Sequence, residues 1–364
     1  MNQHASSVTS GLQKLVREQL ARAGGWLPFD RYMALALYAP GLGYYANASR
    51  KFGTLPASGS DFVTAPEMSP LFGQALAVQL GEALERTGTQ ELWEFGAGSG
   101  ALASELLKAL GDRVQRYTIM ELSASLRARQ EEALRPWAGR VQWASALPER
   151  LAGVVVGNEV LDAMPVKLLQ RLDGAWHERG VGLGADGLQW QDRPTALRPP
   201  LEPAGDHDYL TEIHPQAEAF LRTLAERLER GAAFFIDYGF PEAEYYHPQR
   251  NMGTLMCHRG HLADPDPLET PGEKDITAHV DFTGIAVAAQ EAGLPTLGYT
   301  SQGRFLANCG IGTLLQDAAP RQQVAAQALL AEHEMGELFK VIGFQRGPFW
   351  DAVGFRQGDR THTL

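Results

Sequence analysis

The spacing of hydrophobic positions along the chain changes near residue 90. Before that point, apolar residues recur at helical spacing over 9–23, from Pro28 to just before Pro40, and over 68–86, and residues 41–66 form a long irregular stretch. After it, short apolar runs alternate with helical patterns. This alternation predicts an α/β fold with a doubly wound, mostly parallel, Rossmann-like sheet. The predicted strands cover 91–95, 117–120, 141–143, 154–156 and 233–237, and the helices among them cover 101–110, 123–134 and 215–230.

Residues 166–194 interrupt the alternation of strands and helices. The segments 166–169 and 176–179 flank Asp173-Gly174, a dipeptide that favours a tight hairpin turn, and Ala185-Asp186-Gly187 marks a further turn. We therefore predict an antiparallel β insertion over 166–194. The last third of the chain is predicted to hold helices over 281–292 and 320–335 and strands over 295–299, 338–346 and 349–355.

These elements divide the chain into two predicted parts. Residues 1–88 form an N-terminal helical and lid-like segment, because an irregular stretch as long as 41–66 is uncommon unless it binds something or closes over a site. Residues 89–364 form the core, which carries the β insertion and a substrate-side segment at about 240–282.

Composition narrows the class of protein. The 364 residues include 43 acidic and 32 basic ones, and the net charge is −11. Proteins that bind nucleic acid usually carry a basic patch, and the sequence has no such cluster, so nucleic acid is not an expected partner. A negative surface would instead attract a cationic segment of a substrate.

Cysteine content and hydropathy bear on the compartment. Cys257 and Cys309 are too few for a disulfide framework, which fits a reducing environment. The first residues are polar and lack the apolar stretch of a secretion signal, and no apolar run approaches the roughly 20 residues that span a bilayer. We therefore expect a cytoplasmic protein without membrane insertion.

The strongest local motif lies where the strand 91–95 turns into the helix 101–110. It reads Glu94-Phe95-Gly96-Ala97-Gly98-Ser99-Gly100. Glycines let the backbone turn sharply and approach a ligand closely, and the start of the helix presents free N–H groups. Glu121 ends the next strand, where an acid accepts hydrogen bonds from the ribose of an adenosine cofactor. These residues predict a nucleotide-binding site.

The identity of the nucleotide depends on two further residues. Gly96-x-Gly98-x-x-Ala101 also satisfies the dinucleotide pattern, so the glycines alone leave NAD(P) open. Glu94 favours S-adenosylmethionine, because a carboxylate suits the cationic amino-acid end of this cofactor and repels a pyrophosphate. Asn158-Glu159 adds polar groups at the carboxyl edge of the sheet, where ligands bind in such folds. As plainer interpretations, Glu94 could pair with an arginine, and Glu121 could be a solvated acid at a strand end.

Further motifs are spread in order over residues 27–346: Arg31-Tyr32-Met33, Pro40-x-x-Gly43-Tyr44-Tyr45, Asp61-Phe62-Val63-Thr64-x-Pro66-Glu67, Glu121-x-Ser123-x-x-Leu126-Arg127, Asn158-Glu159-x-x-Asp162-Ala163-x-Pro165, Asp237-Tyr238-Gly239, Gly253-Thr254-Leu255, Asp275-Ile276-Thr277-Ala278-His279-Val280-Asp281-Phe282 and Phe339-Lys340-Val341. Together with the glycine-rich turn, they resemble the MidA family of methyltransferases, which includes a mitochondrial arginine methyltransferase needed for assembly of respiratory complex I. The resemblance implies S-adenosylmethionine-dependent methyl transfer to a protein, with an arginine side chain as the acceptor and a respiratory-complex subunit as a candidate partner. One departure is a serine before the acid in Gly59-Ser60-Asp61-Phe62.

Arginine methylation needs groups that hold and polarise a guanidinium, and carboxylates do so with paired hydrogen bonds. Glu159 and Asp162 are the predicted carboxylates, because they would face the same way if residues 159–162 were helical. Asn158 could contact the substrate or the cofactor, and His279 could act as a general base. Asp162 could instead cap a helix or pair with Lys167.

The predicted catalytic residues are therefore Glu159, Asp162, Asn158 and His279. The predicted cofactor-binding residues are Glu94, Gly96, Gly98, Gly100, Glu121, Leu122, Asp61 and Asn158. Glu67 also fits a capping box in a helix that starts at Thr64.

No metal site is predicted. Neither Cys257-His258-x-x-His261 nor the segment 275–281 supplies four well-placed zinc ligands, so these histidines are expected in loops or in a substrate groove. Three other functions stay open: a methyltransferase that acts on a small molecule, an NAD(P)-linked oxidoreductase, and a cofactor-binding assembly factor with little turnover.

Overall fold

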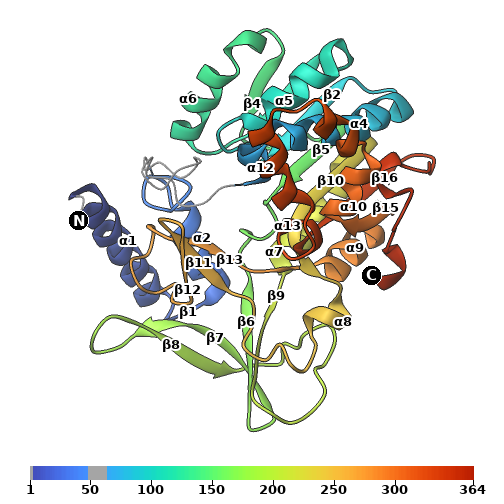
Figure 1. The fold of residues 1–364 in the computed structure, drawn as a ribbon. Helices are drawn as coiled ribbons and strands as arrows, with labels where there is room; N and C mark the ends of the chain where they lie inside the picture. The colour runs from blue at the N-terminus through green and yellow to red at the C-terminus, as the bar shows by residue number, and fades with distance from the viewer. Residues whose placement is uncertain (1–2, 48–63) are drawn as a thin grey trace.

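A mixed α/β sheet forms the centre of the structure, a computed structural model that describes residues 3–47 and 64–364 (Figure 1). Its strands, in spatial order, are β15 (Thr296–Ser301), β16 (Phe339–Arg346), β10 (Leu228–Phe240), β5 (Leu151–Asn158), β2 (Glu91–Phe95), β3 (Arg116–Met120) and β4 (Val141–Ala144), with β14 (Val280–Asp281) beside the end of β10. Neighbours from β10 to β4 are parallel, whereas β16 is antiparallel to both β10 and β15. The predicted doubly wound, mostly parallel fold is confirmed.

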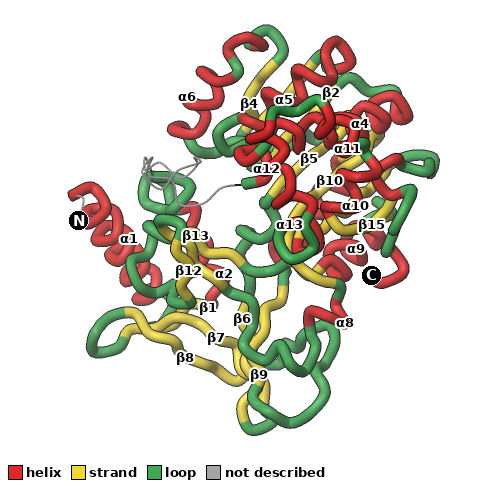
Figure 2. Tube along the Cα trace, viewed as in Figure 1, coloured by secondary structure: helices red, strands yellow, loops and turns green. Residues whose placement is uncertain are grey.

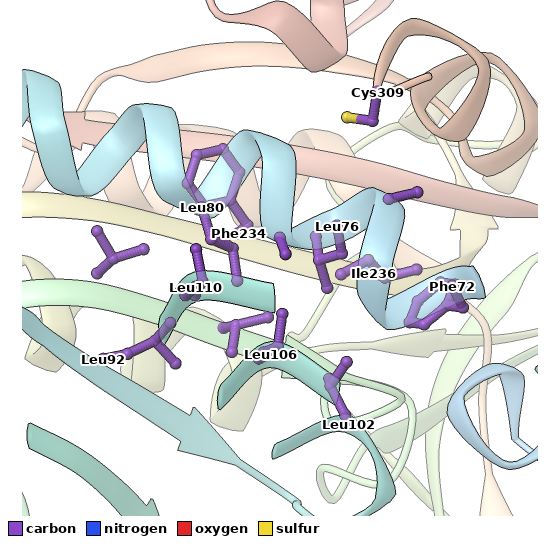
Figure 3. Close-up of a cluster of buried hydrophobic side chains, with 14 of the residues drawn as sticks. Phe72, Leu76, Leu80, Leu92, Leu102, Leu106, Leu110, Phe234, Ile236 and Cys309 are labelled. Atoms are coloured by element: carbon purple, nitrogen blue, oxygen red, sulfur yellow. The ribbon is translucent and has the colours of Figure 1, made fainter. Parts of the chain in front are cut away.

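Helices cover both faces of this sheet because side chains alternate along its buried strands. Phe234 and Ile236 of β10 point to one face, where they pack against α4 (Pro70–Thr87) and α5 (Ala101–Leu110), as Figure 3 shows. Phe235 points to the other face and packs with α7 (Pro215–Arg227) and α9 (Phe282–Glu291). This period of two is the pattern of a strand that is buried on both sides.

Local sequence sets the ends of α4. Ser69 accepts a hydrogen bond from the Leu71 N–H, and Pro70 occupies the first helical position, where its missing N–H is no loss. Gly88 ends the helix in the left-handed region, with a φ of 61°. Because α4 packs on the large sheet, the last part of the predicted segment 1–88 lies against the core.

Further helices are α6 (Ala124–Ala133), α8 (Glu242–Tyr245), α10 (Gln302–Asn308), α11 (Ile311–Gln316), α12 (Pro320–Leu330) and α13 (Met335–Leu338), with 3-10 turns at Gly111–Arg113, Arg135–Trp137, Val353–Phe355 and Thr361–Thr363. The predicted helix over 320–335 is therefore split, and the predicted strand over 349–355 is wrong. Trp350 and Ala352 are buried with the spacing of a strand, but they pack against helices. Backbone N–H groups of Val353 and Gly354 donate to side chains of α4 instead of to a neighbouring strand.

The predicted β insertion is present as a second, antiparallel sheet. It contains β6 (Lys167–Leu172), β7 (Ala175–Leu183) and β8 (Leu188–Pro194), and it also takes in β1 (Trp26–Pro28) and β9 (Tyr209–Ile213), which were not predicted. Asp173 and Gly174 turn the β6–β7 hairpin with φ angles of 48° and 76°, as an Asp-Gly turn requires.

The N-terminal helices pack on this insertion. Side chains of α1 (Gln3–Arg22) and α2 (Phe29–Tyr38) form a cluster with Leu168, Val181 and Ile276. Ile276 belongs to a small sheet of β11 (Met256–Arg259), β12 (Leu262–Asp264) and β13 (Asp275–Thr277), which was not predicted and which lies beside α2 in Figures 1 and 2. Within the described ranges, no helix combines the length and the apolar character needed to cross a membrane.

Candidate active site

A cavity of about 1120 Å³ opens at the carboxyl ends of β2 and β5. The chain continues from β2 to β3 on one side and from β5 to β10 on the other, so the strand order reverses at this point. Ligands of doubly wound sheets bind at such reversals. The volume exceeds the roughly 300–1,000 Å³ of pockets for drug-sized ligands, which leaves room for a cofactor and a second group.

The glycine-rich turn forms one wall of the cavity. Gly96 and Gly98 line it with φ angles of 65° and 53°, and a Cβ at Gly96 would stand 2.9 Å from Cγ2 of Val160. Gly100, with a φ of 87°, is instead the N-cap residue directly before α5. The Ser99 hydroxyl donates to the Glu67 carboxylate, which comes from the short helix α3 (Ala65–Met68). Thr64 is the N-cap of α3 as expected, but its side chain accepts no hydrogen bond from the first turn.

Glu94 sits in β2 at the edge of the cavity and is 1% exposed. Its carboxylate accepts a hydrogen bond of 2.7 Å from the Tyr117 hydroxyl, and burial raises its pKa to about 7. Among the described residues the partner of Glu94 is this tyrosine and not an arginine or a lysine.

The Glu121 carboxylate is hydrogen-bonded within the protein and is not a solvated acid. One carboxylate oxygen accepts from the Ser123 N–H at 2.8 Å, and the other accepts from Gln130 Nε2 at 2.9 Å. The same Gln130 nitrogen also donates to the carbonyl of Gly98, which ties the acid to the glycine turn. A carboxylate accepts about four hydrogen bonds, so Glu121 retains capacity for two hydroxyl groups of a ribose. Leu122 beside it is 78% exposed and lines the cavity, and this half of the cavity therefore fits an adenosine cofactor.

The predicted helical arrangement of residues 159–162 is wrong. Glu159 has a φ of 53°, which is outside the helical range, and a turn follows β5 instead of a helix. The N–H groups of Val160, Leu161 and Asp162 all donate to one oxygen of the Asp237 carboxylate, at 3.1, 2.9 and 3.2 Å. This buried acceptor on β10 fixes the turn. Glu159 and Asp162 nevertheless both line the cavity.

Three acceptor groups converge on the cavity from this turn. The side-chain amide of Asn158 donates to Glu159 at 2.8 Å, and the carbonyl oxygen of that amide is buried without a partner in the described part of the chain, as is Oδ1 of Asp162. Burial, together with the charge of Asp162, raises the pKa of Glu159 to about 8. Burial also raises the pKa of Asp162 to about 6. Lys167, the alternative partner of Asp162, pairs with Asp30 and Glu178 instead.

His279 also lines the cavity, and the N–H of the preceding Ala278 donates to the carbonyl of Asp162 at 3.0 Å. Its Nδ1 atom is buried and has no hydrogen-bond partner among the described residues. Burial, with Arg250 and Lys340 nearby, lowers its pKa to about 4, so the imidazole is neutral at physiological pH. Its ring stands edge-on to Tyr238 at 5.2 Å.

The other predicted candidates are distributed differently. His258 lines the cavity, whereas His261 lies between β11 and β12 with a φ of 63°. Within the described ranges no cluster of three or more His, Cys, Asp or Glu side chains could hold a metal ion. Asp61 lies outside the described residues.

Several cavity residues were not predicted as site residues. The Tyr38 hydroxyl donates to the carbonyl of Ala163 at 2.9 Å, and the Tyr45 hydroxyl donates to Asp275 at 2.8 Å. A hydrogen bond from Tyr238 lowers the pKa of Asp162, against the larger effect of burial. Tyr45, Tyr238 and Asp275 belong to the motifs quoted above, and this membership is the sequence feature that could have identified them as site residues. No local pattern indicates that these distant segments meet.

Comparison with known proteins agrees with this geometry. A family model for S-adenosyl-L-methionine-dependent methyltransferases matches residues 75–300. The chain is 29% identical over 374 residues to the mitochondrial protein arginine methyltransferase NDUFAF7 homolog of Drosophila melanogaster, covering 91% of this chain and 80% of that protein. The Caenorhabditis elegans homolog of the same name is 26% identical, with 91% of this chain and 85% of that protein covered.

Two solved structures from Burkholderia thailandensis resemble the whole chain. One is a COG1565 superfamily member bound to S-adenosyl-homocysteine, with a TM-score of 0.95 and 49% identity, covering 100% of this chain and 99% of that one. The other is a native structure from the same superfamily, with a TM-score of 0.91 and 48% identity over the same shares of the two chains.

Proposed function

The chain belongs to the MidA family of S-adenosyl-L-methionine-dependent methyltransferases, and from this premise we propose that it methylates an arginine side chain of a protein. An arginine acceptor is named for the curated relatives, which are about a quarter identical to this chain. The acceptor of this chain is argued from its own cavity.

The observation that carries the proposal is a buried group of acceptors without a cation. Glu159, Asp162 and the carbonyl oxygen of Asn158 all face the cavity, and among the described residues none of them pairs with lysine or arginine. A guanidinium brings five N–H donors in a planar fork and keeps its charge when buried. It therefore satisfies several separated acceptors at once, and its charge favours the ionised forms of Glu159 and Asp162, which a neutral hydroxyl or thiol does not.

Different residues of the chain then have different proposed roles in methyl transfer. Gly96, Gly98 and Glu121 would hold S-adenosylmethionine, which supplies a methyl group on a positively charged sulfur. Glu159 and Asp162 would bind and orient the guanidinium. Since the methyl group replaces one N–H proton, a proton must leave the substrate nitrogen. Oδ1 of Asp162 and Nδ1 of the neutral His279 both face the cavity without a partner and are the proposed acceptors.

The proposed partner is a protein, and the family resemblance makes a respiratory-complex subunit a candidate. The net charge of −11 would favour a basic segment around the arginine and disfavours nucleic acid. A cytoplasmic location also stays a prediction, supported by the two cysteines, which are both free and buried.

A methyl-transfer assay with three matched peptides tests the proposal. The purified protein is incubated with methyl-labelled S-adenosylmethionine and peptides that carry arginine, lysine or citrulline at the same position, and label is located by mass spectrometry. We expect label on the arginine peptide alone. Label on lysine would overturn the choice of acceptor, and no label on any peptide would favour the assembly factor with little turnover.

Cofactor affinity should depend on pH through Glu94. Because burial holds the pKa of Glu94 at about 7, it carries a proton below that pH in the free protein. A carboxylate that meets the ammonium end of the cofactor must be ionised, so binding releases this proton. We expect the affinity for S-adenosylhomocysteine to fall by up to about tenfold per pH unit below about pH 7. Calorimetry across this range measures the effect.

Two variants separate this effect from other groups. Glu94→Gln should bind more weakly at about pH 8 and lose most of the pH dependence, because no proton is released. Glu159→Gln should keep the dependence, although burial also raises the pKa of Glu159. An unchanged profile in Glu94→Gln would show that another group titrates.

A further inference from the structure

Asp237 is a buried carboxylate that does not appear in the proposed chemistry. It lies in β10 and is 0% exposed. One oxygen accepts from the N–H groups of Val160, Leu161 and Asp162, and the other accepts from the N–H of Tyr238 at 2.9 Å. Four backbone N–H groups, and no basic side chain of the described residues, donate to this carboxylate. Burial and the nearby Asp162 and Glu159 nevertheless raise its pKa well above the usual range of an aspartate.

The turn that Asp237 holds has an unfavourable backbone. Glu159 adopts a φ of 53°, a region that residues with a Cβ seldom occupy and that persists only where surrounding contacts impose it. Its N–H donates to the carbonyl of Ile236 at 2.9 Å, which brings the turn beside β10. Consecutive N–H groups then converge in a concave cluster that suits an anion. Asp237 fills this concavity from behind the cavity wall.

The adjacent residue acts on the same turn from the cavity side. Tyr238 lines the cavity and hydrogen-bonds the Asp162 carboxylate. Successive strand residues point to opposite faces, so Asp237 can hold the backbone of the turn while Tyr238 holds one of its side chains. The remaining oxygen of Asp162 is left without a partner in the described residues and faces the cavity.

We propose that Asp237 is a positioning residue for methyl transfer: it locks the turn 159–162 so that the carboxylates of Glu159 and Asp162 stand at one fixed separation for a cationic substrate. The inference rests on the proposed function, because the separation matters for a ligand that bridges both carboxylates. Asp237 does not touch the substrate; it acts through the three N–H groups it accepts from.

Hydrogen exchange directly measures how strongly Asp237 restrains the backbone of the turn 159–162. Exchange is followed by mass spectrometry in wild type, Asp237→Ala and Asp237→Asn, each saturated with S-adenosylhomocysteine. The alanine variant should exchange the amides of 160–162 at least about tenfold faster, because local opening no longer breaks these bonds. The asparagine variant can still accept from the turn but loses its bond from the Tyr238 N–H, so it should lie between the two.

A matched control removes a different buried acceptor. Gln79 on α4 is 0% exposed and accepts from the N–H of Gly354 at 2.8 Å, away from the cavity. Gln79→Ala should lower thermal stability without changing exchange at 160–162. If the amides of 160–162 exchange no faster in Asp237→Ala than in wild type, Asp237 does not restrain the turn.

Kinetics with the arginine peptide decide whether this restraint of the turn 159–162 contributes to methyl transfer. We expect Asp237→Ala to lower kcat/KM by at least about tenfold, with S-adenosylhomocysteine affinity within about threefold of wild type. Asp237→Asn should recover part of the loss, and Gln79→Ala should retain wild-type kcat/KM. Faster exchange with unchanged kinetics would overturn the positioning role. If wild type itself methylates no peptide, the proposed function fails, and the exchange comparison still decides whether Asp237 locks the turn.

Discussion

Replacing Glu159 by glutamine is expected to lower kcat/KM for an arginine peptide by roughly 10³-fold, while S-adenosylhomocysteine binds within about threefold of wild type. Glutamine keeps the shape of the side chain but removes the negative charge. A guanidinium that enters the cavity would then be buried beside one carboxylate fewer. The loss reflects a buried charge left without its partner, which costs far more than the loss of a surface ion pair.

The control for this prediction is a glutamate that pairs outside the cavity. Glu178 contacts Lys167 at 2.7 Å in the antiparallel sheet, so Glu178→Gln should keep methyl transfer near the wild-type rate. Wild-type activity in Glu159→Gln would remove Glu159 from the proposed chemistry. Equal losses in both variants would point to a general effect on folding.

The second large effect is expected at Glu121. Glu121→Ala should weaken S-adenosylhomocysteine binding by at least about 100-fold, because hydrogen bonds to a charged acceptor contribute about 1.5–3 kcal/mol each and two ribose hydroxyls can meet this carboxylate. The change also leaves one N–H of the Gln130 amide and the N–H of Ser123 without their acceptor. Isothermal calorimetry measures the affinity, and thermal melting shows whether the variant is folded.

An exposed glutamate on the following helix provides the control. Glu131 lies on α6 and pairs with Arg127 at the surface, at 2.8 Å. Glu131→Ala should bind S-adenosylhomocysteine like wild type. If Glu121→Ala did so as well, the ribose assignment would be incorrect and the adenosine would have to bind elsewhere in the cavity.

The cofactor half of the site could be read from the sequence because it is local. Strand β2, the glycine turn, α5, β3 and Glu121 follow one another within about thirty residues, and each is marked by its own period or by glycines. Predicted and observed bounds agree for β2 and α5. In this unit neighbours along the chain are also neighbours in space.

The substrate half could not be read in the same way. Tyr38, Asp275 and His279 meet at the cavity from segments more than two hundred residues apart. The conformation at Glu159 is set by Asp237 on another strand, so the helical expectation for 159–162 failed for a tertiary reason. The prediction of a strand over 349–355 is wrong for a similar reason. Buried and exposed residues do alternate there, but the backbone pairs with side chains of α4 instead of with a neighbouring strand.

In the proposed function, the cavity joins a cofactor half to a half that selects a cation. The most direct measurement is a calorimetric titration of the S-adenosylhomocysteine-loaded protein with an arginine peptide and with the same peptide carrying citrulline, which keeps the shape and removes the charge. We expect the arginine peptide to bind at least about 100-fold more tightly, because a guanidinium stabilises the ionised forms of Glu159 and Asp162, whereas neutral citrulline does not. Equal affinity for the two peptides, or binding of neither, would contradict it.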